Sequence, residues 1–360
     1  MNAIVIAMCV VNICYYLPQV RMAFDYYRSI GIGSPVADLG ASYFAKDILM
    51  KQIGHAYMGP IFALMNLLSF TQCAAYAVAA FRWRSLFLWT KATVMLSAGI
   101  TVLFYLAIGT MSGVFHTLVL CTTGWLAAVN RKALATPETL ALADSRYGRL
   151  FAFAVATGLV FFSFIVLVLS SRAASLLINP LFLYRPDSLV YVVFGKNLGD
   201  GIGLASSYIS QGWYGLSNTF AIDFHWTGGM SFSRIFADYY HRFFGPENAQ
   251  PPLSYPLRQQ YLTGYPAYRY WFTIFPWLAS DFTFPGALLL SGLFGAIYGR
   301  MWIITVREGC LVSVSLFALL SIGVLFMNAN SQILDDKSLF LALLGLLALY
   351  PIRYRISGIR

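Results

Sequence analysis

The feature of this sequence that most constrains its fold is the recurrence of apolar runs close to 20 residues long. A helix that crosses the hydrocarbon core of a bilayer needs about 17–25 such residues. Runs that meet or approach this length lie near residues 2–18, 56–80, 86–107, 112–129, 150–170, 283–300, 310–328 and 337–352. Only 11% of the 360 residues are charged, whereas soluble domains carry about 25%. The sequence therefore predicts an all-α polytopic membrane protein with about eight or more transmembrane helices.

Basic residues concentrate in the short connections between these runs. Such connections lie at residues 81–91, 131–149 and 299–308 and in the C-terminal tail, which carries Arg353, Arg355 and Arg360. Short cytoplasmic loops are enriched in Lys and Arg, so we assign them all to the cytoplasmic side. The net charge of +10 is thus no indication of a nucleic-acid partner. The opposite face receives the turn GTMSG (109–113), residues 328–337 and two long segments, 19–54 and 171–282.

The second long segment divides the predicted chain into three parts. Residues 1–170 form an N-terminal transmembrane bundle, and residues 283–360 form the C-terminal transmembrane helices. Residues 171–282 form a long loop with short amphipathic or re-entrant helices. Loops longer than about 12–15 residues are uncommon unless they are functional, so we expect the functional site in this loop.

The loop contains aromatic residues flanked by glycine, in the stretches QGWYGLS and WTGG. Trp213, Tyr214 and Trp226 either anchor in the headgroup layer of a membrane or stack on sugar faces, where a ring covers apolar C–H groups. The neighbouring glycines either let the backbone approach a ligand closely or serve a tight turn. From the residues alone, both interpretations stay open.

Arginines on the outer face indicate a partner with fixed negative charge, because a guanidinium binds phosphate oxygens bidentately and stays protonated. Lipid headgroups are one such partner, and the pyrophosphate of a lipid-linked sugar is another. An enzyme that expels pyrophosphate needs positive charge where the leaving group develops its own charge. The candidates for catalysis are Arg242 and Arg269, and those for substrate binding are Arg28, Arg185, Arg234 and Arg258.

The loop also offers two histidines and one carboxylate at the mouth of a predicted span. His241 is a candidate catalytic base and His225 a candidate for hydrogen bonds to the substrate, although a lone histidine also serves structural roles. Asp281 is either catalytic or a helix N-cap. The sequence has no HExxH, P-loop or nucleophile elbow, and its five cysteines lie in or beside apolar runs without CxxC spacing. We therefore predict no metal, cofactor or disulfide.

Several of these stretches together match the motifs of a known family. QGWYGLSNTF (211–220) is followed by HWTGGMS (225–231), and WFTIFPWLASDFTFPG (271–286) stands at the entry to a late span. GTMSG (109–113) and MNANSQ (327–332) match a glycine turn and an Asn-rich element. In these stretches the chain resembles the bacterial O-antigen polymerases of the Wzy type, whose members usually have ten or more spans.

The resemblance implies a GT-C-like glycosyltransferase of the bacterial inner membrane, metal-independent and inverting, with the long loop in the periplasm. Its substrates would be undecaprenyl-pyrophosphate-linked oligosaccharides. The terminal hydroxyl of one repeat unit would attack the anomeric carbon of another, and undecaprenyl pyrophosphate would leave. The implied partners are membrane lipid and a chain-length regulator protein, with no nucleic acid.

Three other functions stay open from the sequence. An O-antigen ligase also uses a long outer loop with arginine and histidine. A flippase or transporter would need ionisable residues within its spans, and these are nearly absent here, with His116 as the main exception. A structural membrane subunit would use the polar loop to dock a partner.

Overall fold

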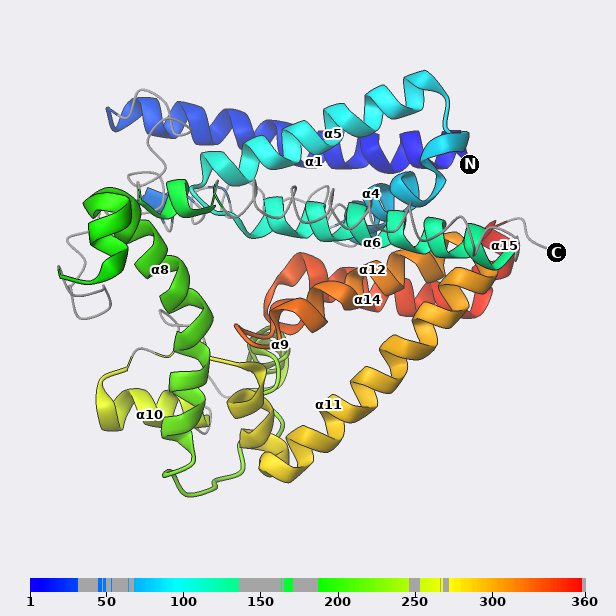
Figure 1. Ribbon diagram of the computed structural model, residues 1–360. Coiled ribbons are helices and arrows are strands. Elements are labelled where there is room, and N and C mark those ends of the chain that lie inside the picture. Colours follow the sequence, from blue (N-terminus) through cyan, green and yellow to red (C-terminus); the bar gives the residue numbers. More distant parts are fainter. Residues whose placement is uncertain are drawn as a thin grey trace. The chain divides into compact units, whose positions relative to one another are not determined.

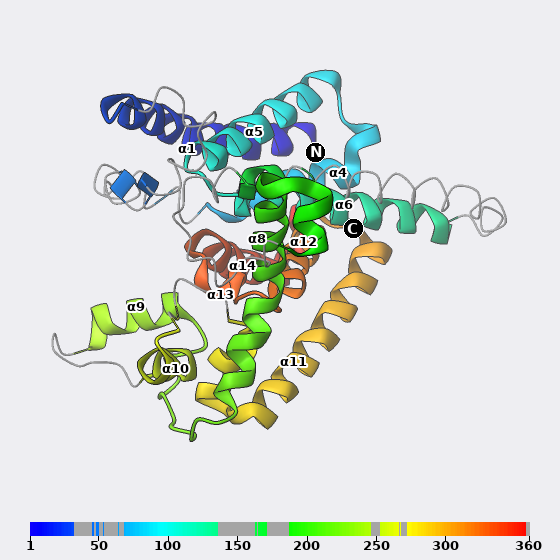
Figure 2. The same cartoon turned by 60° about the vertical axis from the view of Figure 1, so that its left-hand side comes forward.

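The computed structural model describes residues 1–31, 45–46, 48–49, 53, 64, 68–135, 163, 165–170, 187–245, 253–265, 267 and 272–357. Secondary structure in these residues is helical, without strands (Figures 1 and 2), which confirms the predicted all-α class. The chain forms two compact units. The first comprises Met1–Met65 with Ala75–Ser207, and the second comprises Asn66–Ala74 with Tyr208–Arg360.

Within the described ranges, five helical stretches are long and apolar enough to cross a membrane. They are α1 (Asn2–Ser29), α5 (Leu88–Ala107), most of α6 (Ser112–Ala135), α11 (Ile274–Glu308) and the C-terminal stretch Lys337–Arg355. Each overlaps a predicted run, although α1 continues past residue 18 to Ser29, into the segment predicted to be an outer loop. Together they support a membrane protein. The apolar helix α12 (Leu311–Phe326) is shorter, at 16 residues. The runs at 56–80 and 150–170 lie largely outside the described residues, so the number eight stays a prediction.

The first unit is built on the packing of α1 and α6 against α5. At one end, the Asn2 side-chain carbonyl accepts hydrogen bonds from Phe87 N (3.1 Å) and Thr90 Oγ1 (2.9 Å), which ties the start of α1 to that of α5. At the other end, Gly109 takes a φ of 66° and reverses the chain between α5 and α6. A left-handed residue of this kind ends many helices and is usually glycine. The GTMSG stretch is therefore a helix–helix turn.

Helix α8 (Leu189–Thr219) continues from the first unit into the second and is interrupted at Gly195, whose φ of 70° is not helical. The second unit then adds α9 (Arg234–Phe244), α10 (Tyr255–Thr263), α13 (Gln332–Asp335) and α14 (Lys337–Leu349). The short helices η4 (Tyr350–Ile352) and α15 (Arg353–Ser357) follow α14. Helix α12 is buried along almost its whole length and packs against α11, α13, α14 and α15.

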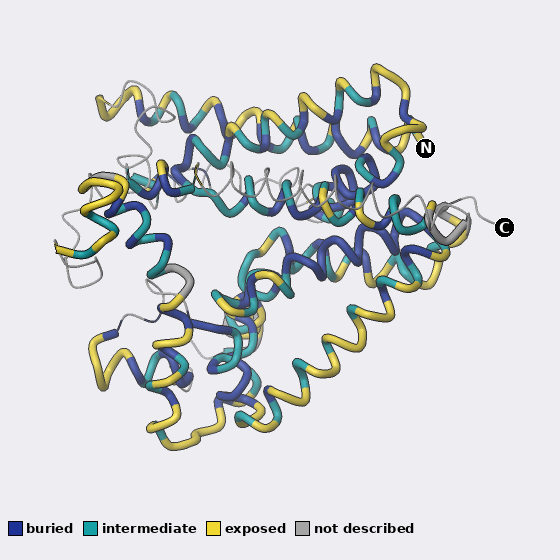
Figure 3. The backbone as a smooth tube through the Cα atoms, in the orientation of Figure 1, coloured by how far each residue is buried: buried dark blue, intermediate teal, exposed yellow. Residues whose placement is uncertain are grey.

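Helix α11 is apolar yet exposed along most of its length (Figure 3), as expected of a helix whose surface faces lipid. It starts at Ile274, ahead of the predicted 283, and its helical geometry breaks once, at Thr283. There φ is 63° and ψ is 167°. Pro285 follows two residues later, where the missing N–H is tolerated because the first turn of a helix leaves its N–H groups unbonded. The polar start of α11 is thus a separate short helix joined to the apolar remainder.

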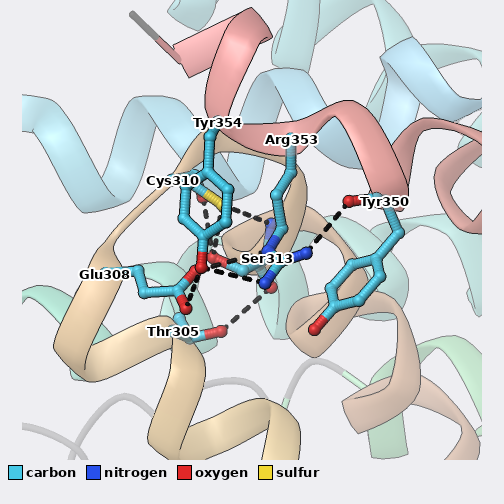
Figure 4. A network of polar contacts seen from close by, with 7 residues as sticks. All are labelled: Thr305, Glu308, Cys310, Ser313, Tyr350, Arg353 and Tyr354. Atoms are coloured by element: carbon cyan, nitrogen blue, oxygen red, sulfur yellow. Dashed lines mark hydrogen bonds and ion pairs between the residues drawn. The ribbon is translucent and has the colours of Figure 1, made fainter. Parts of the chain in front are cut away.

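The far end of α11 carries a polar network that ties it to α12 and α15 (Figure 4). Arg353 forms an ion pair with Glu308 (3.4 Å), and Tyr354 donates a hydrogen bond to the same carboxylate (2.7 Å). Thr305 Oγ1 donates to Ser313 O (2.9 Å). From residue 284, just past the break, to residue 308 the helix rises about 36 Å at 1.5 Å per residue, which exceeds the thickness of about 30 Å of the hydrocarbon core of a bilayer. Asp281 and Glu308 therefore belong to opposite faces of any membrane that α11 crosses.

Candidate functional site

The centre of the candidate site is the carboxylate of Asp281, which is buried with 7% exposure in the short first part of α11. Its Oδ1 accepts hydrogen bonds from Gly229 N (2.8 Å) and from the hydroxyl of Thr227. Its Oδ2 accepts from Ser231 N and Phe232 N, both at 2.9 Å. A buried carboxylate is tolerated when its lone pairs are satisfied in this way. Asp281 therefore holds residues 227–232 as a closed loop, which we call the TGG loop.

The sequence of the TGG loop explains how its N–H groups converge on one side chain. Gly228 and Gly229 take φ values of 68° and 79°, a region that other residues enter only at a steric cost. Thr227 N donates a hydrogen bond to Ser280 O (3.2 Å), and Ser280 Oγ accepts from Tyr255 N (2.8 Å). The loop, the start of α10 and the start of α11 are thereby joined. The glycines of WTGG serve a tight turn, one of the two interpretations open from the sequence.

A second cluster lies beside this loop and is built around Arg258 of α10. Arg258 Nη1 approaches His225 Nδ1 at 2.9 Å and also donates to the carbonyl of Asp223. Its Nε donates to Leu253 O (3.1 Å), and its guanidinium lies 4.5 Å from the centre of the Tyr255 ring. These contacts fix the guanidinium in one orientation against the segment that leads into the TGG loop.

His225 Nδ1 lies near two groups of opposite hydrogen-bonding character, Arg258 Nη1 at 2.9 Å and the carbonyl oxygen of Asp223 at 3.4 Å. A guanidinium has no acceptor, so the contact at 2.9 Å is a hydrogen bond only when His225 Nδ1 offers a lone pair. The neutral imidazole then carries its proton on Nε2. In this state, exposed His225 presents a hydrogen-bond donor, whereas a hydrogen bond from Nδ1 to the Asp223 carbonyl needs the other tautomer.

The charge of Arg258 is not neutralised by a carboxylate in the described part of the chain. The ion pairs found there are Arg21 with Asp25 and Arg353 with Glu308. Arg258 Nη2 is buried and has no hydrogen-bond partner among the described residues. Burial raises the pKa of the neighbouring Tyr255 phenol, and the guanidinium partly opposes this rise. The cluster therefore keeps a fixed positive charge and an unused N–H donor.

Helix α8 presents two faces in the stretch QGWYGLS. Trp213 and Tyr214 are exposed, and the Tyr214 ring lies 5.5 Å from that of Tyr265. The two glycines face the protein. A Cβ on Gly212 would lie 2.6 Å from the backbone oxygen of Asn328, and one on Gly215 would lie 2.7 Å from the Phe272 ring. These glycines therefore serve close helix packing, a role that neither sequence interpretation included.

Helix α9 carries three further predicted residues. Arg234 is its first residue, and Arg234 N donates to Asp335 Oδ1 (3.2 Å). Burial raises the pKa of Asp335 to about 6. His241 and Arg242 lie in the last turn of α9, and their side chains are outside the described part of the structure.

The remaining predicted residues are dispersed. Trp226 is exposed beside the TGG loop, and Arg28 lies near the end of α1 in the first unit. Arg185 and Arg269 lie outside the described residues. The described residues contain no group of three or more His, Cys, Asp or Glu side chains that could hold a metal ion.

Sequence reasoning missed the residues that assemble the site. Thr227, Ser280 and Tyr255 join three segments, and Ser254 caps α10 by accepting from Leu257 N (3.5 Å). Ser254 carries a local signal, a serine two residues before a proline. The pairing of Ser280 with Tyr255 has no such signal, because the two residues are 25 positions apart.

Comparisons with protein-family models, with curated proteins and with solved structures found no match to this chain. The resemblance to O-antigen polymerases therefore stays a prediction, and the function has to be argued from the geometry of the site.

Proposed function

We propose that this protein polymerises undecaprenyl-pyrophosphate-linked oligosaccharide repeat units, as an O-antigen polymerase does, by glycosyl transfer at the periplasmic face of a bacterial inner membrane. The observation that carries the proposal is the Arg258–His225 pair. It is fixed beside the TGG loop and lies at the polar end of an apolar helix long enough to cross a bilayer.

We assign the two ends of α11 to the two sides of the membrane from the distribution of basic residues along the helix. Arg300 and Arg307 lie near the end of the helix that carries Glu308, and Arg353 and Arg355 follow in α15. Enrichment of arginine in short connections favours the cytoplasm for that end. The end that carries Asp281 is then extracytoplasmic, which is where lipid-linked repeat units would be joined.

The proposed glycosyl transfer needs a positively charged group beside the leaving pyrophosphate. The acceptor hydroxyl forms a C–O bond to the anomeric carbon of the donor, and the bond from that carbon to the pyrophosphate oxygen breaks. The electron pair of the broken bond stays on the pyrophosphate. Arg258 offers a fixed cation and the Nη2 donor for this developing charge, and electrostatic stabilisation of this type often contributes more to catalysis than any other effect.

The proton of the attacking hydroxyl needs a base. His225 Nδ1 is already in contact with Arg258 Nη1 and with the Asp223 carbonyl, so we assign this histidine to substrate binding and not to proton abstraction. The four hydrogen bonds that Asp281 accepts suit a positioning residue that holds the loop. His241 is the other histidine of residues 171–282, and we assign it the role of general base, with Arg242 beside it as a second phosphate ligand.

The exposed rings supply a surface for the sugars. Trp213 and Tyr214 on α8 and Trp226 beside the TGG loop are exposed, and all three belong to the second unit. An aromatic face can cover the apolar C–H groups of a sugar while hydroxyl groups at its edge remain hydrated. Stacking of this kind tolerates several sugars, which suits an enzyme that must accept a growing chain.

The test is a lipopolysaccharide gel from the native host after deletion of the gene and complementation with variants. Wild type should restore the ladder. Arg258→Ala should reduce polymer by about 10²–10³-fold, as when one donor to a developing oxyanion is removed, and should leave a single repeat unit on the core. Arg307→Ala is the matched control, because Arg307 is an exposed arginine in the last turn of α11, at the end of that helix away from the TGG loop.

Other outcomes of the deletion would overturn the proposal. Loss of all O-antigen from the core, with accumulation of lipid-linked polymer, would assign a ligase. An unchanged ladder would remove both enzymes and leave a transporter or a structural subunit. Variant levels in the membrane fraction must match wild type, so that a loss of polymer reports on chemistry.

A further inference from the structure

Helix α9 has an aromatic stripe along one side. Phe236, Tyr240 and Phe243 are spaced by four and three residues, so they share one face of the helix, and all three are exposed, Phe243 by 75%. Ile235 lies on a different side and is buried. The helical register places positions 234, 238, 241 and 242 on the arc opposite the stripe, and these positions are Arg, Asp, His and Arg in the sequence.

The start of α9 is attached close to the start of the C-terminal apolar stretch. Arg234 N donates to Asp335 Oδ1 (3.2 Å), and Ser233 Oγ donates to Leu334 O (2.6 Å). The apolar stretch begins at Lys337, two residues after Asp335, and two residues extend by at most about 7 Å. The first turn of α9 is therefore held at the level where this stretch would enter the membrane.

We propose that α9 is an interfacial helix that lies on the outer leaflet, with Phe236, Tyr240 and Phe243 inserted at the boundary between headgroups and acyl chains. An aromatic stripe opposite a polar, charged arc is a property of helices that lie in the plane of a membrane surface. Aromatic side chains also favour this depth. We propose that lipid covers the stripe, because the hydrogen bonds to Leu334 and Asp335 hold α9 beside the point where the stretch Lys337–Arg355 would enter the membrane.

This placement has a consequence for the charged residues of α9. A helix fixed at headgroup depth keeps its opposite arc at the water side of the phosphates. Positions 241 and 242 then lie on the water side, next to the layer that holds a lipid phosphate or pyrophosphate. The placement itself needs no substrate and stands whether or not the protein transfers sugars.

The experiment measures depth with a fluorescent label. The five cysteines are replaced by serine or alanine, and Phe243→Cys or Asp238→Cys is labelled with NBD. The full chain is reconstituted in vesicles of phosphatidylethanolamine and phosphatidylglycerol, with or without phosphatidylcholine brominated on its acyl chains. Residue 238 is the matched control, because it lies on the same helix and on the opposite arc.

We expect the label at 243 to emit at shorter wavelength and to be quenched by brominated lipid several-fold more than the label at 238. Equal, water-like emission at both positions would overturn the proposal. A blue-shifted label at 243 that brominated lipid does not quench would also overturn it, since the stripe would then be covered by protein. A second measurement needs no substitution. Phospholipid with a photoreactive acyl chain should cross-link to residues 236–243 of the unmodified chain, and absence of that cross-link would count against lipid contact.

Discussion

The substitution Asp281→Asn tests whether one carboxylate holds the TGG loop. In the wild type, Oδ1 and Oδ2 each accept two hydrogen bonds, and three of the four donors are backbone N–H groups. Asparagine keeps one acceptor oxygen and places an NH₂ group where the other oxygen was. In the better orientation the amide oxygen faces Ser231 and Phe232, and the NH₂ group then faces Gly229 N.

The expected change in the free energy of opening the TGG loop follows from the hydrogen bonds that the substitution removes or weakens. One charge-assisted hydrogen bond, worth about 1.5–3 kcal/mol, disappears, and the others lose their charge assistance. The lost bond is the one from Gly229 N, and this half-buried N–H group would then face a second donor, which places the cost at the upper end of that range. We expect the free energy of opening the TGG loop to fall by about 3 kcal/mol, which corresponds to about a hundred-fold change in the opening equilibrium.

The assay is amide hydrogen exchange, followed by mass spectrometry on the full chain in nanodiscs. Exchange in residues 227–232 should accelerate by about a hundred-fold in the Asp281→Asn variant, because exchange from local opening follows the free energy of that opening. Polymer length in the complemented host should fall in parallel.

The matched control is Asp336→Asn. Asp336 Oδ1 caps α14 by accepting from Ser338 N (2.9 Å) and Leu339 N (3.0 Å). Asparagine caps a helix about as well as aspartate, so exchange at the start of α14 should change little and exchange at residues 227–232 should not change. Unchanged exchange at 227–232 in Asp281→Asn would refute the assignment of the carboxylate as the anchor of the loop. Faster exchange with full-length polymer would refute its link to function.

Two further predictions concern packing and pH. Gly212→Ala should lower the free energy of unfolding by about 1–3 kcal/mol, because the new Cβ would meet the backbone of Asn328 at 2.6 Å. The control is Gly292→Ala, where the new Cβ would have nothing within 4 Å, and it should raise the free energy of unfolding by up to about 1 kcal/mol. Thermal unfolding in nanodiscs compares the two variants. Equal effects would contradict the packing argument. Burial raises the pKa of Asp335 from 3.8 to about 6, so folding favours the protonated acid, and stability present below pH 3.8 should be lost as pH rises through 6. Asp335→Asn should remove that dependence in a pH series of unfolding measurements, and an unaltered series would show that another group titrates.

The sequence predicts the apolar helices well because a span is a local property. Runs at 86–107 and 112–129 coincide with α5 and α6, and the glycine turn between them forms at Gly109. The predicted entry to α11, at 283, lies nine residues after the observed start at Ile274, because Ser280 and Asp281 lower the hydropathy. The helix continues through both residues because a distant loop satisfies the carboxylate. An average of hydropathy over neighbouring residues cannot take account of hydrogen bonds from residues as distant as Ser231 and Phe232.

The sequence identifies candidate residues for the site but does not predict how these residues contact one another. Asp281 and Arg258 both stand out in the sequence for their charge. The hydrogen bonds that define their roles reach 52 residues back to Gly229 and 33 residues back to His225. For the glycines of QGWYGLS, in contrast, the sequence does contain a usable signal. Their spacing places Gly212 and Gly215 on the side of α8 away from Tyr214, which already favours packing over contact with a ligand.

The start of α11 combines two unfavourable features within three residues. A buried carboxylate is costly unless its hydrogen bonds are complete, and Thr283 holds a backbone conformation that costs about 1–3 kcal/mol and persists only where the surroundings fix it. A continuous apolar helix would avoid both. The surroundings do fix this segment, because Asp281 anchors the TGG loop and the Phe284 ring packs against Phe220 (4.7 Å) and Tyr255 (5.4 Å). Departures from local rules that are compensated in this way concentrate at functional sites. What these compensations hold in place is the TGG loop, which follows closely after His225, and this is why we propose that the leaving pyrophosphate binds there and not among the apolar helices.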